Sequence, residues 1–215
     1  MVFPAVAART FEMFKEEGSF RKLIKQMVRK VSKIGSASKR ARYVHDKIDQ
    51  EVEFLFKDPA VNNLVSCKKG CNACCHGQVS VTEDEANLLV DLIEDGVKID
   101  WSRLWHQAEF KNDSQAFLKL PYSLRGCIFL DESGECQVYE DRPSVCRTNF
   151  VVSEPQLCRI EEGSENKVRL LNTFAADSWV YSLFKVSKQS GSLPFLVKKL
   201  LSERKVYSKR DDLDL

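Results

Sequence analysis

Cysteine is absent from residues 1–66 and from residues 159–215 of this 215-residue chain. All eight cysteines lie between these flanks, and four of them fall within the nine residues from Cys67 to Cys75. Random placement does not empty both flanks and gather four thiols into one short loop. Thiolates at such spacing are the ligands of zinc ions and of iron–sulfur clusters. The distribution therefore predicts a metal site.

Long apolar runs are also missing, since no stretch approaches the ~20 residues of a membrane span. The first nine residues lack the charged segment and the long apolar segment of a signal peptide. We therefore expect a cytoplasmic location, where thiols stay reduced and clustered cysteines bind metal more often than they form disulfides. A disulfide framework is the alternative.

The usual motifs of nucleotide-binding enzymes and hydrolases are absent, namely GxGxxG, GxxxxGK[ST], HExxH and GxSxG. The acidic run from Glu83 to Glu85 is explained by the start of a helix, where the helix dipole favours carboxylates. The sequence thus leaves open whether the chain is an enzyme.

Acidic residues are missing from residues 18–45, although the net charge of the whole chain is only +2. This segment carries nine cations, Arg21, Lys22, Lys25, Arg29, Lys30, Lys33, Lys39, Arg40 and Arg42. A solvated face of a packed helical hairpin is the favoured interpretation. The alternative is that basic residues 21–42 bind RNA phosphates or a protein partner.

Apolar spacing predicts helices over about 19–34 and 36–56, then over 83–93, 101–108, 164–188 and 192–201. Short strands are expected at Val79–Val81 and Cys127–Leu130, with a turn at Asp131–Gly134. The expected fold is mainly α, with a small irregular α+β metal-binding core of cysteine-rich loops and short strands flanked by helices. We expect an amino-terminal helical hairpin (1–60), a cysteine-cluster domain (61–160) and carboxyl-terminal helices packing on the core, followed by an acidic tail (161–215).

Eight thiols suffice for two sites of four. Adjacent side chains seldom reach one ion without strain, so Cys74 and Cys75 are expected to serve different sites or different irons. Cys67, Cys71 and Cys74 form a natural first group, which the later cysteines would complete. His76 is left out of the ligand set. Among the cations near the cysteines (Lys68, Lys69, Arg125, Arg142, Arg147 and Arg159), Arg142 and Arg147 are the favoured partners of the site.

Two composite motifs carry a family resemblance. The segments Cys67-Lys-Lys-Gly-Cys71-Asn-Ala-Cys74-Cys75 and Cys127-Ile-Phe-Leu-Asp-Glu-Ser-Gly-Glu-Cys136-Gln-Val-Tyr-Glu-Asp-Arg142-Pro143-Ser-Val-Cys146-Arg147 resemble the signatures of the YkgJ-type cysteine-cluster family over about residues 64–160. The resemblance implies a zinc- or iron-chelating domain. It also implies a ligand role for Cys67, Cys71, Cys74, Cys75, Cys127, Cys136 and Cys146, and for Cys158 with less regular spacing.

The first loop also has the spacing of the four-iron motif of radical SAM enzymes, but the strand–helix repeats of those enzymes do not follow it. A related cluster occurs in flagellin lysine N-methylases, whose catalytic machinery has no counterpart here. Two hypotheses result. In the first, the thiolates hold zinc or an iron–sulfur cluster, with a four-iron cluster among the options, in a redox or sensing role. In the second, zinc staples a non-catalytic module whose flanking helices bind a partner.

Overall fold

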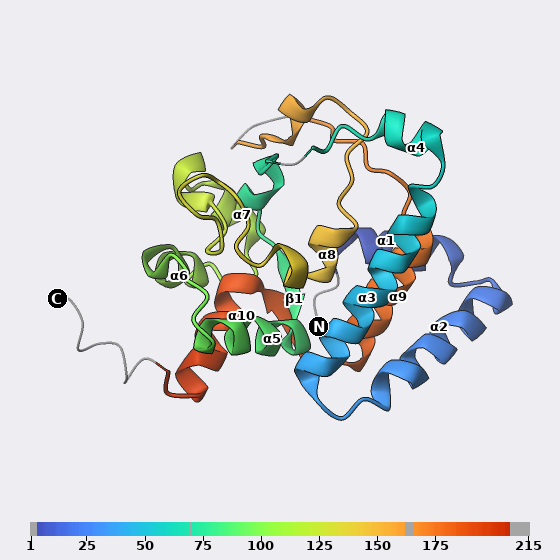
Figure 1. Cartoon of the computed structure of the whole chain (residues 1–215), viewed down its shortest axis with the longest axis horizontal. Helices are drawn as coiled ribbons and strands as arrows, with labels where there is room; N and C mark the ends of the chain where they lie inside the picture. Colours follow the sequence, from blue (N-terminus) through green and yellow to red (C-terminus); the bar gives the residue numbers. More distant parts are fainter. Residues whose placement is uncertain (1–3, 69, 162–165, 207–215) are drawn as a thin grey trace.

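The computed structural model describes residues 4–68, 70–161 and 166–206, and these segments form a mainly helical fold with one small antiparallel sheet (Figure 1). The expected fold class is confirmed. The α-helices are α1 (Ala5–Phe14), α2 (Gly18–Ser32), α3 (Ala37–Leu55), α4 (Pro59–Leu64), α5 (Glu83–Glu94), α6 (Trp101–Ala108), α7 (Ser114–Leu118), α8 (Ser144–Arg147), α9 (Phe174–Val186) and α10 (Leu193–Glu203). The 3-10 helices are η1 (Ala73–His76), η2 (Tyr122–Arg125), η3 (Tyr139–Asp141) and η4 (Pro155–Cys158), and the strands are β1 (Ser80–Thr82) and β2 (Ser190–Ser192).

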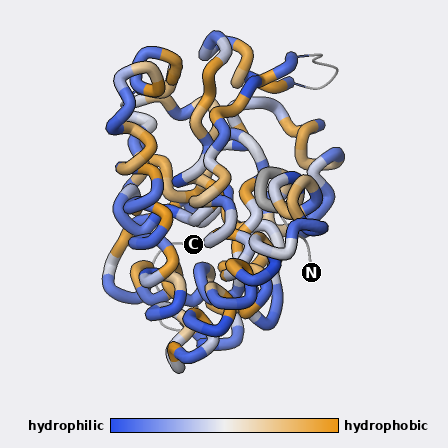
Figure 2. Tube along the Cα trace, turned by 90° about the vertical axis from the view of Figure 1, so that its right-hand side faces the viewer, coloured by the Kyte–Doolittle hydropathy of each residue, from blue (hydrophilic) through white to orange (hydrophobic). Residues whose placement is uncertain are grey.

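The predicted amino-terminal hairpin is present as α2 and α3. Ser36 begins α3 by accepting a hydrogen bond from the backbone N–H of Lys39. The buried faces of both helices pack on α9, and α2 lies on the outside of this group (Figure 1). Hydrophilic and hydrophobic segments alternate along the turns of the trace in Figure 2, because an amphipathic helix faces the core on one side only. The result is one hydrophobic core formed by α2, α3 and α9.

A second hydrophobic core lies under the cysteine-rich region. It contains buried residues of α5, α6 and α10 together with Ile128 and Phe129. Thr82 and Glu85 form a capping box at the start of α5, as the sequence predicts. Strand β1 pairs with β2 in the register Ser80 with Ser192, which places α10 directly against α5. This core supports the cysteine loops from below.

The helix predicted over 164–188 begins only at Phe174, so this prediction was wrong at its amino-terminal end. Leu170 instead pairs with Val151 in a β-bridge, and Leu171 N–H donates to Phe150 O at 2.8 Å. Residues 162–165 lie outside the described residues. Apolar side chains at helical spacing can lie equally well in an extended segment when a partner strand satisfies the backbone.

The strand predicted at Cys127–Leu130 is not formed either. Leu130 N–H donates to Cys127 O within a turn, and only Leu130 pairs, in a single bridge with Cys136. The turn at Asp131–Gly134 is confirmed, and Gly134 has a φ of 81°, a backbone conformation that favours glycine. The sequence did not predict α1, β2 or the short helices α4, α7 and α8.

The proposed boundaries at residues 60 and 160 stay a prediction. Both cores take helices from the carboxyl-terminal segment, since α9 packs on the hairpin and α10 packs on α5 and α6. The acidic tail lies outside the described residues. Within the described segments, no helix has both the length and the apolar character that crossing a membrane requires.

Candidate metal centre

The first cysteine loop connects α4 to β1 and is attached at both ends to the later cysteine segments. Near its start, Cys67 Sγ accepts the backbone N–H of Val151 at 3.3 Å. In its middle, the Asn72 side chain donates to Gly134 O at 3.1 Å, in the turn that precedes Cys136. At η1, Cys75 O accepts the N–H of Cys127 at 2.8 Å. Segments separated by more than fifty residues in sequence are thus joined around the thiols.

The other four cysteines lie in three separate parts of the structure around this loop. Cys127 and Cys136 pack against the core beneath the loop, Cys146 lies in α8, and Cys158 ends η4, which contacts η1. All eight cysteines are free thiols; Cys71 and Cys74 are exposed and the other six are partly buried. The structure therefore brings the predicted ligands to one region of the molecule.

The effects of the cysteines on one another's pKa values indicate two groups of sulfurs, with Cys74 in range of both. Burial raises the pKa of Cys158, and so does the negative charge of the Cys71, Cys67 and Cys74 thiolates. Burial likewise raises the pKa of Cys146, with further contributions from Cys127, Cys74 and Cys136. Since charges act only over short distances in water, these effects identify neighbouring sulfurs. We name them the Cys67 group (Cys67, Cys71, Cys74 and Cys158) and the Cys75 group (Cys75, Cys127, Cys136 and Cys146).

Cys74 lies where the two groups meet. A hydrogen bond from the Cys75 thiol lowers the pKa of Cys74 to about 6, whereas the same bond, with burial, raises the pKa of Cys75. Burial raises the pKa of Cys127 to about 11. The hydrogen bond from Cys75 thus favours the thiolate form of Cys74, and thiolates are the form that binds metal.

The sulfurs are neighbours without forming a finished coordination sphere. Among the residues that the structure describes, no group of three or more Cys, His, Asp or Glu side chains is placed to hold a metal ion. The chemistry of the donors nevertheless fits such a group, because thiolate sulfur suits zinc and iron–sulfur clusters and each takes about four.

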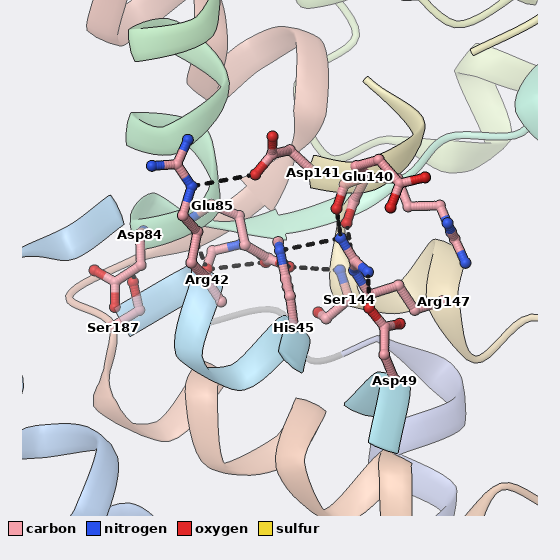
Figure 3. A network of polar contacts seen from close by, with 12 residues as sticks. Arg42, His45, Asp49, Asp84, Glu85, Glu140, Asp141, Ser144, Arg147 and Ser187 are labelled. Atoms are coloured by element: carbon pink, nitrogen blue, oxygen red, sulfur yellow. Dashed lines mark hydrogen bonds and ion pairs between the residues drawn. The ribbon is translucent and has the colours of Figure 1, made fainter. Parts of the chain in front are cut away.

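A buried polar network positions the loop that carries Cys146 (Figure 3). Arg147 is 2% exposed, donates to the carboxylate of Asp49 on α3, and donates to the backbone carbonyls of Glu140 and Arg142. It also contacts His45 Nδ1 at 3.5 Å. Because a guanidinium can only donate, His45 Nδ1 accepts and its Nε2–H faces Glu85 Oε1 at 3.2 Å. The network connects the hairpin to the cysteine region.

Glu85 is the centre of this network and is almost completely buried. Its carboxylate accepts the backbone N–H groups of Thr82 at 2.8 Å and Ser144 at 2.7 Å. Burial by itself would raise the pKa of Glu85, but these bonds and the one from His45 outweigh it and lower the pKa to about 2. Sequence reasoning found the capping role of Glu85. The sequence did not predict the bond to Ser144, because the Thr82-to-Glu85 pattern indicates only a helix start.

A cluster of three arginines gathers around His76 and Tyr122, next to the first cysteine loop. His76 stacks on Tyr122 with ring centroids 4.2 Å apart, and the guanidinium groups of Arg159 and Arg125 lie 4.5 and 5.2 Å from the Tyr122 ring centre. Arg103 approaches His76 beside Gly126, whose missing side chain leaves room for the Arg103 guanidinium. His76 Nδ1 contacts Asn72 O at 3.1 Å.

Of the two favoured cations, Arg147 is buried in the network, while Arg142 lies over the Tyr139 ring at 4.0 Å and lowers the pKa of Cys136, which burial raises overall. The sequence places Arg125 near the cysteines but cannot show that its side chain is buried. It is 2% exposed.

The fold and the site define a helical protein that carries a cysteine-rich domain. Residues 66–169, about half of the chain, match the CxxCxxCC family, described as "Putative zinc- or iron-chelating domain". The match confirms the predicted resemblance to a chelating cysteine-cluster family. No curated protein and no solved structure matches the chain significantly.

Proposed function

We propose that the chain binds zinc or an iron–sulfur cluster through its cysteine thiolates and that each group of four supplies one centre. The observation that carries this proposal is that eight free thiols, from segments distant in sequence, converge into two neighbouring groups. The adjacent Cys74 and Cys75 fall into different groups, which avoids the strain of binding one ion with neighbouring side chains. The family match supports chelation of zinc or iron.

A redox or sensing role is the favoured use of such a centre. Two observations support it. The thiols of Cys71 and Cys74 are exposed, so electrons or oxidants can reach the site. The two hydrophobic cores lie beside the thiols and not among them, so metal is not the sole source of stability. Such chemistry suits the cytoplasm, where thiols stay reduced, and the proposal includes no catalytic step.

Metal binding requires the loops to close. The described side chains hold no complete site, and the described residues of the loop from Cys67 to Gly77 have no regular structure apart from the single turn η1. We expect metal to draw Cys71 and Cys158 together, because both lie in short turns and not in long helices. Binding should then order these loops and leave α2, α3 and α9 unchanged.

Paired cysteine substitutions test the assignment. Cys71→Ser with Cys158→Ser should remove the centre of the Cys67 group and leave about half of the metal, since each centre takes about four thiolates. Cys136→Ser with Cys146→Ser should do the same for the Cys75 group. The measurement is elemental analysis of the full chain, purified without air.

His76→Gln is the matched control, because His76 adjoins Cys75 but is not a proposed ligand, and it should keep the full metal content. Loss of all metal from either double variant would contradict two separate centres. Retention of all metal in both would remove the proposed ligand set.

A second candidate function is a zinc-stapled, non-catalytic module that binds RNA through the outer face of α2. On that face, Arg21, Lys22, Lys25, Arg29, Lys30 and Lys33 are exposed, and they form no ion pair with any residue that the structure describes. Arg40 and Arg42 instead pair with Asp84 and Asp141 and hold α3 to the cysteine region. The surface available to a partner is therefore α2, which is shorter than the range 21–42.

Salt dependence tests this candidate. A single-stranded RNA of mixed sequence should bind the full chain, and Lys25→Glu with Arg29→Glu should reduce the slope of log K against log salt by about 1.4, or about 0.7 per lost phosphate contact. Lys57→Glu with Lys119→Glu is the control, since both residues are exposed and lie outside α2. Absence of RNA binding at low salt, or equal slopes in the two variants, would exclude the candidate.

A further inference from the structure

Arg125 is a buried cation whose charge is unpaired in the described part of the chain. It ends η2, is 2% exposed, and its Nε has no hydrogen-bond acceptor among the described residues. None of the ion pairs formed by the described residues includes it. Its guanidinium lies over the Tyr122 ring, 5.2 Å from the ring centre.

Such an arrangement is costly unless an opposite charge faces it. A buried unpaired charge loses its hydration, and one aromatic face replaces only a small part of that loss. The neighbouring cations increase the cost, since Arg103 and Arg159 lie around the same rings. Each of these two has its own carboxylate, Asp100 at 3.1 Å and Glu161 at 2.6 Å. Arg125 is therefore the member of the cluster that lacks a counter-charge.

Arg125 borders the thiol region. Arg125 precedes Cys127 by two residues, and the two line one small cavity of about 10 Å³. That volume accommodates at most one water molecule, so no anion of useful size fits there. Tyr122, whose ring faces the Arg125 guanidinium, is in electrostatic range of Cys74 and Cys71 of the Cys67 group. A metal ion bound by four thiolates carries a net charge of about −2.

We propose that Arg125 is a built-in counter-charge of the metal–thiolate region that it borders, a positioning residue that favours a centre with net negative charge. This inference rests on the proposed metal binding. It explains why a cation is buried at the end of η2 without a carboxylate: the protein holds a charge that is balanced only when the centre is loaded. A soluble anion such as phosphate is disfavoured because the cavity beside the side chain is too small to hold it.

Arg125→Met separates this role from simple packing, because methionine fills similar space without charge. In the metal-free chain, removal of an unpaired buried charge should raise the Tm by about 3 °C. In the loaded chain, loss of the counter-charge should weaken zinc binding by about tenfold to a hundredfold. The two effects have opposite signs, which loss of packing alone cannot produce. Arg125→Lys keeps the charge and should restore most of the affinity.

The experiment uses the full reduced chain, stripped by a chelator without air, with thermal unfolding of the metal-free form and Zn²⁺ titration against a competing chelator. Arg204→Met is the control, because Arg204 is paired with Asp91 and Glu94. It should lower the Tm of the metal-free chain and leave zinc affinity unchanged.

Three results would overturn the inference. The first is a Tm that falls in both forms of Arg125→Met while the wild type binds zinc, which indicates a packing role. The second is unchanged zinc affinity in that variant. The third is a rise of the wild-type Tm with inorganic phosphate that Arg125→Met abolishes, which would assign the charge to a soluble anion. A wild type that binds neither zinc nor iron would instead refute the proposed function itself.

Discussion

At the scale of single residues, buried polar side chains determine how the cysteine region is held. Glu85 and Arg147 are both almost fully buried and both bind backbone groups of the segment around Cys146. A buried charge is tolerated only when it is hydrogen-bonded and balanced, and these two balance each other through His45. Their positions therefore specify one placement of the loop.

Asp177 gives a pH prediction of its own. Burial raises the pKa of this carboxyl from 3.8 to about 6, although the hydroxyls of Thr10 and Thr173 donate to it at 3.0 Å. Between these pKa values the folded chain binds more protons than the unfolded chain, so stability should fall as the pH rises from about 4 to 6 and stay constant above.

Asp177→Asn removes this dependence. We expect the stability of the wild type relative to the variant to fall by roughly 2 kcal/mol between about pH 4 and pH 7. The measurement is urea unfolding of the metal-free chain at each pH. A difference that rises with pH would show that the buried carboxyl is stabilised as the anion, contrary to this account.

At the scale of elements, the hairpin is attached to the cysteine region by ion pairs as well as by apolar packing. Helix α3 pairs Arg40 with Asp84. It also pairs Arg42 with Asp141 and Asp49 with Arg147 (Figure 3). Arg147 adjoins Cys146, so α3 reaches the metal region through one residue. Docking of α3 and the geometry of α8 should therefore be coupled.

Asp49→Asn tests this coupling. It leaves the buried Arg147 without its carboxylate, and because Asp49 is partly exposed we expect a loss of roughly 1–2 kcal/mol in the free energy of unfolding. Asp46→Asn on the same helix is the control, since its carboxylate is exposed and its contact with Lys47 is worth little. Equal stability of the two variants, measured by urea unfolding, would show that the pair does not hold α3.

Several elements could be predicted from the sequence because their signals are local. The stripe from Phe20 to Val31 requires one helix face, and Thr82 with Glu85 requires a helix start. Leu170 could not be placed, because its extended backbone depends on a partner, Val151, nineteen residues earlier. For the same reason β2 was missed, since Ser190 to Ser192 carries no strand signal without β1.

The candidate site, like the fold, could be predicted from the sequence only in part. The eight cysteines are identified by their clustering, but their grouping depends on which loops meet in space. The tie between Asn72 and Gly134, and the bond from Cys127 N–H to Cys75 O, carry no sequence signal. Burial of Arg125 likewise depends on packing around η2, so sequence could note only its nearness to Cys127.

At the scale of the whole molecule, two apolar cores lie beside the thiol-rich region. One core joins α2, α3 and α9, the other joins α5, α6 and α10, and the contact between α3 and α5 connects them (Figure 1). Helices from the carboxyl-terminal segment complete both cores. The fold can thus support the cysteine loops in the absence of metal, and metal is expected to order those loops.

The central claim is that the thiols hold metal. Its most direct test is elemental analysis together with a visible spectrum of the full chain purified without air. We predict stoichiometric zinc in a colourless sample, or iron with matching sulfide and a broad visible absorption. A sample with neither metal and with its thiols paired in disulfides would contradict the account.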